Sequence, residues 1–253
     1  MDRPHRHNEL ELNLVERGFI VYLFPGRRIE VQAGELFFFW SAVPHQMIAR
    51  GQNTHIHWMM LPLAEVLQWK LPKDLMRSVL EGKPVISADD TFIPGDLAGF
   101  RRWHADLLSA DQERRQTLLL EVQARLRRLA DIRPSSARFV AGAAGSQKGE
   151  TMARYLSEHF LENWRIRDVA REVDLHPNYA AQVFQQTFGI TMVEYATQLK
   201  IAMAQQKLVM SEQDILTIAF DCGFGSISRF YTAFKAVTDT TPHAFRAALR
   251  WVG

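Results

Sequence analysis

Histidine and glutamate side chains alternate near the start of the chain, at a spacing that could support binding chemistry. In an extended strand, residues two apart share a face. One face would then carry His5, His7, Glu9 and Glu11, and the other Leu10, Leu12 and Leu14. Imidazole and carboxylate groups gathered in this way can hold Zn, Fe, Mn or Ni, or can hydrogen-bond a small polar ligand. We expect His5, His7, Glu11 and His45 to contact a small-molecule effector without a metal cofactor. A metal site and a merely structural or exposed face are the alternatives.

Tryptophan side chains offer a second kind of contact. Trp rings stack on the apolar faces of sugars, so Trp40 with His45 and His57 could form a pocket with an apolar wall and polar tips. Core packing is the more common role for any one of Trp40, Trp58 and Trp69. The sequence therefore predicts Trp40 and His57 as effector contacts, with the core role as the alternative. Phe37, Phe38 and Phe39 are expected in the core.

The elements that position these side chains are short strands. Residues 5–60 alternate between apolar and polar types and are interrupted by Gly and Pro, which favours a β-sandwich or barrel. Residues 62–95 contain four prolines and give no clear pattern. Residues 96–131 carry apolar residues at helical spacing and predict a helical hairpin. Residues 133–149 are small and polar, typical of a linker, so we place a domain boundary there.

The C-terminal part contains the same helix-turn-helix pattern twice. Apolar residues at i, i+3, i+4 and i+7 occur in residues 215–222 and again, 49 positions earlier, in residues 166–173. In the second copy, Gly223 can adopt a positive φ and Ser226 can cap the following helix. After the turn the offset becomes 50, so Phe184 matches Phe234. A single pattern is weak, but a twofold match over some thirty residues is specific.

Residues 191–210 lie between the two copies and contain neither Gly nor Pro. Twenty helical residues span about 30 Å, close to the roughly 34 Å of one turn of B-DNA. Two recognition helices held at this distance could enter successive major grooves on one face of the duplex. The pattern thus indicates binding to double-stranded DNA.

The chain resembles the AraC/XylS family of bacterial transcription regulators. The resemblance rests on IAFDCGFGSISRFYTAFKAVTDTTPHAFR and VAREVDLHPNYAAQVFQQTFGITMVEY. It implies seven helices in residues 150–253, a dimer, contact with RNA polymerase and, in the usual case, activation of transcription. The family usually has Gly at the position of Asp239; Asp tolerates the left-handed conformation, so the turn should survive. His5, His7, Glu11 and His45 resemble the two cupin motifs, and sensor domains of this family are often cupin-like.

The family resemblance also implies which side chains read DNA, because the repeated phenylalanines let the family's contact positions be carried over by register. Counting back from Phe234 gives Ser228, Arg229 and Thr232, and counting back from Phe184 gives Asn178 and Gln182. Asn and Gln suit adenine, Arg suits guanine or phosphate, and Thr can meet a thymine methyl group. We add Ser226, at the helix start, and Lys235, in the basic segment 225–250. Many family members carry Arg at Gln182 and Thr232, so base preference does not transfer.

These observations predict an α+β chain of two domains. Residues 1–132 form a cupin-like sandwich or barrel with a helical hairpin, 133–149 a linker, and 150–253 an all-α domain with two helix-turn-helix motifs. The 30 Lys and Arg against 28 Asp and Glu give a net charge of +2, so charge alone does not indicate nucleic acid. One cysteine, a polar start and no long apolar run favour a cytoplasmic protein without a membrane segment.

The chain carries none of the common catalytic motifs, and Cys222 falls on the inner stripe of a helix, so we do not expect an enzyme. We expect a regulator of carbohydrate uptake or catabolism genes that responds to a sugar. The alternatives are a metal-dependent cupin enzyme fused to a DNA-binding domain, and an effector-independent repressor.

Overall fold

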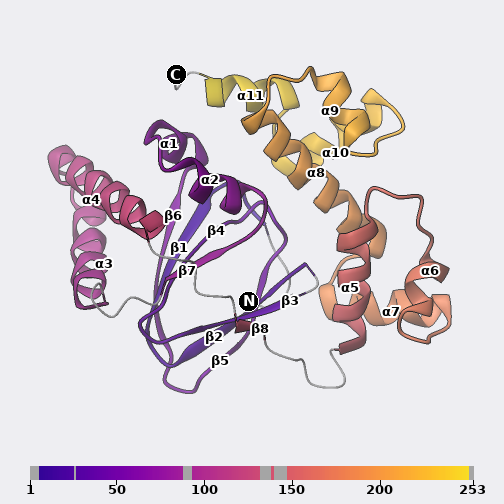
Figure 1. Cartoon of the computed structure of the whole chain (residues 1–253), viewed down its shortest axis with the longest axis horizontal. Helices are drawn as coiled ribbons and strands as arrows, with labels where there is room; N and C mark the ends of the chain where they lie inside the picture. The colour runs from indigo at the N-terminus through magenta and orange to yellow at the C-terminus, as the bar shows by residue number, and fades with distance from the viewer. Residues whose placement is uncertain (1–5, 26, 88–92, 132–137, 140–146, 251–253) are drawn as a thin grey trace.

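The computed structural model describes residues 6–25, 27–87, 93–131, 138–139 and 147–250. Its N-terminal part contains two four-stranded antiparallel sheets (Figure 1). The first has the order β6-β1-β4-β7, from β1 (Leu10–Arg17), β4 (Leu36–Trp40), β6 (His55–Leu61) and β7 (Val85–Ser87). The second has the order β5-β2-β3-β8, from β2 (Phe19–Phe24), β3 (Arg27–Gln32), β5 (Gln46–Arg50) and β8 (Arg138–Phe139). The predicted sandwich is confirmed.

Each face of the first sheet packs against a different layer. Along β1, Leu10, Leu12 and Leu14 are fully buried on the outer face, together with Phe38 and Trp40 of β4. Phe37 and Phe39 point the opposite way, into an apolar cluster shared with Tyr22 and Phe24 of the second sheet. Successive side chains of a strand thus enter different apolar clusters on the two faces of the sheet. All three phenylalanines of β4 are buried as predicted.

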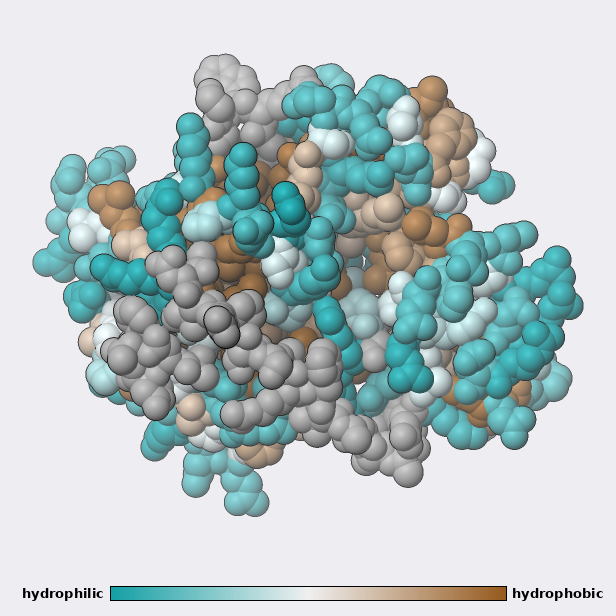
Figure 2. Space-filling model, viewed as in Figure 1, coloured by the Kyte–Doolittle hydropathy of each residue, from teal (hydrophilic) through white to brown (hydrophobic). Residues whose placement is uncertain are grey.

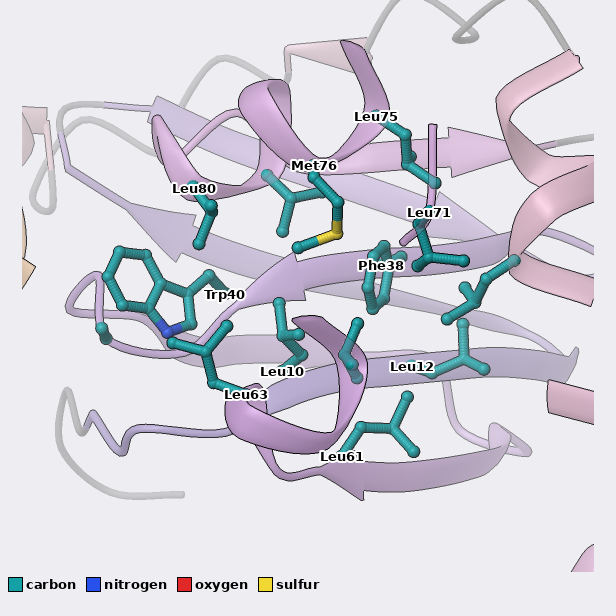
Figure 3. Packing of buried hydrophobic residues seen from close by; sticks show 14 of the residues in the cluster. Leu10, Leu12, Phe38, Trp40, Leu61, Leu63, Leu71, Leu75, Met76 and Leu80 are labelled. Carbon is teal, nitrogen blue, oxygen red and sulfur yellow. The ribbon is translucent and has the colours of Figure 1, made fainter. Parts of the chain in front are cut away.

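Two short helices cover the outer face, α1 (Leu63–Gln68) and α2 (Lys73–Leu80). Figure 3 shows Leu63, Leu75, Met76 and Leu80 from this region directed onto the strands. Full burial of one such side chain contributes roughly 1.5–3 kcal/mol of transfer free energy. Both helices lie in residues 62–95, for which no element could be predicted from the sequence.

The predicted helical hairpin is formed by α3 (Ile93–Leu108) and α4 (Gln112–Asp131). The two helices are joined by a buried, bidentate ion pair between Arg125 and Asp96, with N···O distances of 2.6 and 2.9 Å. Phe100 and Trp103 are buried as expected. Helical spacing predicts one apolar stripe of Leu97, Phe100, Trp103 and Leu107, and this stripe is wrong at its end because Leu107 is 55% exposed. Leu108 and Leu120 are also exposed on this hairpin.

The C-terminal part contains seven helices among the described residues, as the family resemblance implied. They are α5 (Gln147–His159), α6 (Ile166–Arg171), α7 (Pro177–Phe188), α8 (Met192–Met210), α9 (Ile215–Asp221), α10 (Ile227–Thr238) and α11 (Pro242–Arg250). Helix α8 runs between the α6–α7 unit and the α9–α10 unit (Figure 1). Figure 2 shows a mostly hydrophilic face over the α5–α7 end.

The proposed linker lies largely outside the described residues. Within it, Arg138–Phe139 forms β8 against β3, and α5 already begins at Gln147. These few residues belong to regular structure, and the linker and the domain boundary within residues 133–149 stay a prediction. In the described part of the chain, no helix combines the length and apolarity needed to cross a membrane.

Candidate nucleic-acid interface and effector site

The second helix-turn-helix unit consists of α9 and α10. Gly223 leaves α9 with a φ of 72°, and the Ser226 hydroxyl caps α10 by accepting the backbone N–H of Arg229 at 3.3 Å. Phe230 and Phe234 are fully buried and fix the inner face of α10. The exposed side of α10 carries Ser228, Arg229, Thr232 and Lys235. All four predicted contacts on this helix are accessible, while Ser226 is half-buried.

The first unit, α6 and α7, repeats this arrangement. The N-cap of α7 is His176, whose Nδ1 accepts the backbone N–H of Asn178 at 3.4 Å, and Pro177 occupies the first helical position. Asn178 and Gln182 are exposed one helical turn apart. Each recognition helix ends at a left-handed residue, Gly189 in α7 and Asp239 in α10, so the turn at Asp239 is preserved as predicted.

The register also identifies two positions that the sequence prediction missed. With the offset of 50, Tyr179 matches Arg229 and Gln185 matches Lys235, and both are exposed on α7. Between the units, the 19 residues of α8 span about 28 Å at 1.5 Å per residue. The length of α8 is thus of the order of one turn of DNA.

Cys222 is fully buried beneath α9, and burial raises the pKa of its thiol to about 12. It therefore stays protonated near neutral pH and packs as a small apolar side chain, as predicted.

A buried polar cluster lies on the inner face of the first sheet. The Oε1 atom of Glu11 is 2.8 Å from Nε2 of His7 and 3.2 Å from Nε2 of His45. The Ser41 hydroxyl donates to the same oxygen at 3.1 Å, and the Asn13 amide donates to Oε2 at 3.3 Å. Glu11 is 4% exposed and His45 is fully buried. Three of the predicted effector residues thus converge; His5 lies outside the described residues.

The hydrogen-bond geometry specifies where the protons are. Nδ1 of His45 lies 3.0 Å from the carbonyl oxygen of Val43, which can only accept, so this nitrogen must donate. Nε2 then faces the carboxylate of Glu11, so a proton or another cation must lie between them. His7 has one ring nitrogen against Glu11 and the other 3.0 Å from Glu9. The cluster therefore places N–H donors of both rings around the carboxylate of Glu11.

The pKa shifts agree with this assignment. Burial alone would raise the pKa of Glu11, but hydrogen bonds from His45 and His7 hold it far below its ordinary value. Burial alone would lower the pKa of His7, but its contacts with Glu11 and Glu9 raise it instead. Both pKa shifts show that the contacts stabilise the charged forms, the Glu11 carboxylate and the His7 imidazolium.

The same donor set could hold a divalent metal ion. One atom each from His7, Glu11 and His45 lie within 4.8 Å of one another, and two imidazoles with one carboxylate suit Zn, Fe, Mn or Ni. The carbonyl of Val43 orients His45 as an outer partner orients a metal-bound histidine. The geometry is thus compatible with either a polar ligand or a metal.

The predicted pocket of Trp40, His45 and His57 is not formed. Trp40 is 1% exposed on the outer face of β4, within the apolar cluster, because it is an odd number of residues from the inward-facing Phe39. His57 projects from β6 on the same outer side and contacts Glu16 instead. Trp69 is also buried.

Sequence reasoning missed the tryptophan that lies beside the polar cluster. In the β1–β6 register, Trp58 is opposite Asn13 and Met60 is opposite Glu11, so all four share the inner face. Trp58 is 67% exposed and Met60 is 53% exposed. An open apolar surface therefore adjoins buried hydrogen-bonding groups. A separate cavity of about 420 Å³ is lined by Met47, Ile48, Ala49 and Arg50 of β5, none of which belongs to the polar cluster.

Comparison with known proteins agrees with both halves of this description. Residues 1–130 match the AraC-like ligand binding domain, and residues 169–248 match a helix-turn-helix domain. The chain belongs to the AraC family of transcriptional regulators, with one domain for ligand binding and one for DNA binding.

Individual relatives are similar over nearly the whole chain. The melibiose operon regulatory protein of Escherichia coli (strain K12) is 29% identical over 259 residues, 97% of this chain and 84% of that protein. The HTH-type transcriptional activator RhaS of Salmonella schwarzengrund (strain CVM19633) is 24% identical over 96% of this chain and 86% of that protein. Among solved structures, ToxT from Vibrio cholerae aligns with a TM-score of 0.40 at 13% identity, covering 98% of this chain and 92% of that one.

Proposed function

We propose that this regulator reads two half-sites on one face of DNA and that a sugar bound in the N-terminal half controls its activity. The observation that carries the proposal is the duplicated recognition surface. Helices α7 and α10 present exposed polar side chains at equivalent positions, with α8 between the two units. Exposed side chains at these positions can reach base edges in a major groove.

The sugar effector is supported by the chemistry beside Glu11. Glu11, Asn13, His7 and His45 offer donors and acceptors for hydroxyl groups, and the exposed face of Trp58 offers stacking. The relatives named above include a melibiose operon regulatory protein, which favours genes of carbohydrate uptake or catabolism. A role as activator is supported by the similarity to a transcriptional activator.

One short segment connects the proposed effector site with the DNA-binding half. His7 contacts Glu11, while its neighbours contact C-terminal helices: Arg6 Nη2 donates to the carbonyl of Val237 at 2.5 Å. Asn8 accepts a hydrogen bond from the buried Gln205 of α8 at 2.8 Å. A ligand that moves His7 would therefore act directly on α8 and α10.

The first test is selection of bound sites from a random DNA pool at physiological salt. We expect a motif with two half-sites about one helical turn apart, lost in a Ser228→Ala/Arg229→Ala variant. Recovery of no motif, or the same motif from the variant, would contradict the assignment of α10.

The effector is tested by calorimetry with a panel of sugars. Trp58→Ala should weaken the binding of an active sugar by about tenfold or more, roughly 1.4 kcal/mol. Leu161→Ala, which shortens an exposed apolar side chain between α5 and α6, should have no effect. Absence of heat with every sugar would remove the sugar from the proposal.

A second candidate function is a metal-dependent cupin enzyme fused to the DNA-binding half, and the His7–Glu11–His45 donor set favours it. Loss of a stoichiometric metal ion and of an activity in Glu11→Gln would support it.

We further propose a homodimer and contact with RNA polymerase. The exposed Leu107, Leu108 and Leu120 of the hairpin offer an apolar surface for a second copy.

A further inference from the structure

A second group of metal-binding side chains lies apart from the effector site and from the DNA interface. His55 and His57 are two residues apart on β6, and Glu16 lies near the end of the adjacent β1. His57 is opposite Leu14, so the histidines project from the outer face of the sheet, away from Glu11. The register shift between Val15 and Arg17 lies at Glu16, beside His55.

One carboxylate oxygen is shared by both imidazoles. Oε2 of Glu16 is 2.7 Å from Nδ1 of His55 and 2.7 Å from Nε2 of His57. These three atoms lie within 4.8 Å of one another. Around a four-coordinate zinc ion with bonds of about 2.0–2.2 Å, ligand atoms lie roughly 3.3–3.5 Å apart. Small side-chain rotations would therefore bring the group to coordination geometry.

The surroundings of the group resemble the outer shell of a metal site. Nη2 of Arg101, on α3, donates to the other oxygen of Glu16 at 2.9 Å, as outer partners commonly do for a metal-bound carboxylate. The Phe100 ring, 5.8 Å from the His57 ring, restricts that imidazole.

We propose that Glu16, His55 and His57 bind a divalent transition-metal ion of the zinc class. Two imidazole nitrogens and one carboxylate oxygen suit zinc and similar transition-metal ions better than Mg²⁺ or Ca²⁺, which prefer oxygen ligands. The side chain of His55 is 51% exposed, so the ion has access from solvent and keeps water in its remaining positions. Because Arg101 holds the same carboxylate, a bound ion would fix α3 against β1 and β6. This function is independent of the sugar effector.

The test is the zinc content of the full-length, tag-free protein after removal of metal with a chelator and dialysis against micromolar zinc chloride. His55→Ala and Glu16→Gln should each hold one zinc ion per chain fewer than the wild type. The matched control is His104→Ala, which removes an exposed histidine of α3 outside the group. The test compares the zinc content of each variant with that of the wild type. Its result therefore does not depend on whether the His7–Glu11–His45 cluster also binds zinc.

A second readout separates metal binding from a change in folding. Cobalt should give a stronger visible absorption band in the wild type and in His104→Ala than in His55→Ala, and zinc should raise the melting temperature of the first two by more than that of His55→Ala. Equal zinc content in wild type and His55→Ala, or no zinc in the wild type, would overturn the proposal and leave a hydrogen-bonded cluster.

Discussion

Among single residues, Glu11 determines the character of the inner site. It is one of few carboxylates buried in the described part of the chain, and it gathers two imidazoles, a hydroxyl and an amide around it. Burying an ionised carboxylate is unfavourable unless it is paired and hydrogen-bonded. The paired state should therefore leave a signature in how stability depends on pH.

His7 gives the clearest pH prediction. Its folded-state pKa is raised above 6.5, so its contribution is complete below pH 6.5 and is lost as the pH rises through the folded-state value. Glu11 acts in the opposite direction: its contribution is present above pH 4.5 and is lost in acid. The free energy of unfolding, measured with urea, should fall as the pH rises from 6 towards 8. His7→Gln should reduce this fall; His104→Gln should retain it. An unchanged slope in His7→Gln would contradict the charged pair.

Arg229 gives a prediction for the DNA interface. It is exposed on α10, and if it reads a base, Arg229→Ala should weaken specific DNA binding by roughly 1–3 kcal/mol. Lys73→Ala, an exposed cation on α2, is the control for a general loss of charge. Titration of a selected site by fluorescence anisotropy measures both. Equal affinity of Arg229→Ala and wild type would remove Arg229 from the contacts.

The face of the sheet that a side chain occupies was predictable where it depends on the alternation within one strand. Period two along β1 separates Glu11 from Leu10 and Leu12, so the polar face was correctly predicted. The roles of Trp40 and Trp58 depend on which strands flank them: Trp40 is on a central strand under helices, and Trp58 is on β6 at the sheet edge. No local pattern carries that information.

Among elements, the turn between α9 and α10 illustrates how local rules act. Gly223 and its first-copy equivalent Asp174 both have positive φ, 72° and 52°. Gly225 is the extra residue of the second copy and precedes the N-cap Ser226. The conformational freedom of glycine thus predicted the left-handed position at Gly223, and the change of offset from 49 to 50 predicted one extra residue in this turn.

The two glycines of this turn should respond differently to substitution. Gly223→Ala places a Cβ in the left-handed region, 3.2 Å from Nζ of Lys200, and should lower the free energy of unfolding by about 1–2 kcal/mol. Gly225→Ala meets no atom within 4 Å and should change it by less than about 0.5 kcal/mol. Urea unfolding compares the two variants. Similar effects of both would show that the left-handed conformation is not what selects Gly223.

Helices α1 and α2 show why residues 62–95 could not be assigned. Both follow prolines, Pro62 and Pro72, which stand at the N-cap and start the helix rather than break it. With six and eight residues, the helices are too short for a clear apolar period. Their position comes from packing on Leu10, Leu12 and Phe38, a tertiary contact that local sequence does not encode.

In the whole molecule, the two halves are joined at several separate points. The outer face of the second sheet meets the first helix-turn-helix unit through Leu23, which belongs to the same apolar cluster as Leu156 and Phe184. Near the other unit, Arg6 donates to the carbonyl of Val237 in the last turn of α10; burial lowers the pKa of Arg6 to about 10, so it stays charged at neutral pH. A cation at a helix C-terminus is favourable. Such contacts make the DNA-binding half sensitive to changes in the sensor half.

The strongest polar link between the halves joins β3 to α5. Arg28 forms a bidentate pair with Glu150, with N···O distances of 2.9 and 2.5 Å, and both side chains are about 15% exposed. A bidentate ion pair that is largely buried contributes more to the free energy of unfolding than an ion pair on the surface. A double-mutant cycle with Arg28→Met and Glu150→Gln should give a coupling free energy of about 1–3 kcal/mol. The exposed Lys83–Glu81 pair should give less than about 0.5 kcal/mol in the same assay.

The same variants test whether this contact restrains the DNA-binding half. If Arg28 and Glu150 hold α5 in place, either single variant should increase backbone hydrogen exchange in α5 without unfolding either half. Affinity for a selected two-half-site DNA should also change, because α5 packs against α7 and α8. Unchanged hydrogen exchange in α5 and unchanged DNA affinity, together with a coupling free energy near zero, would contradict a restraining role for this ion pair.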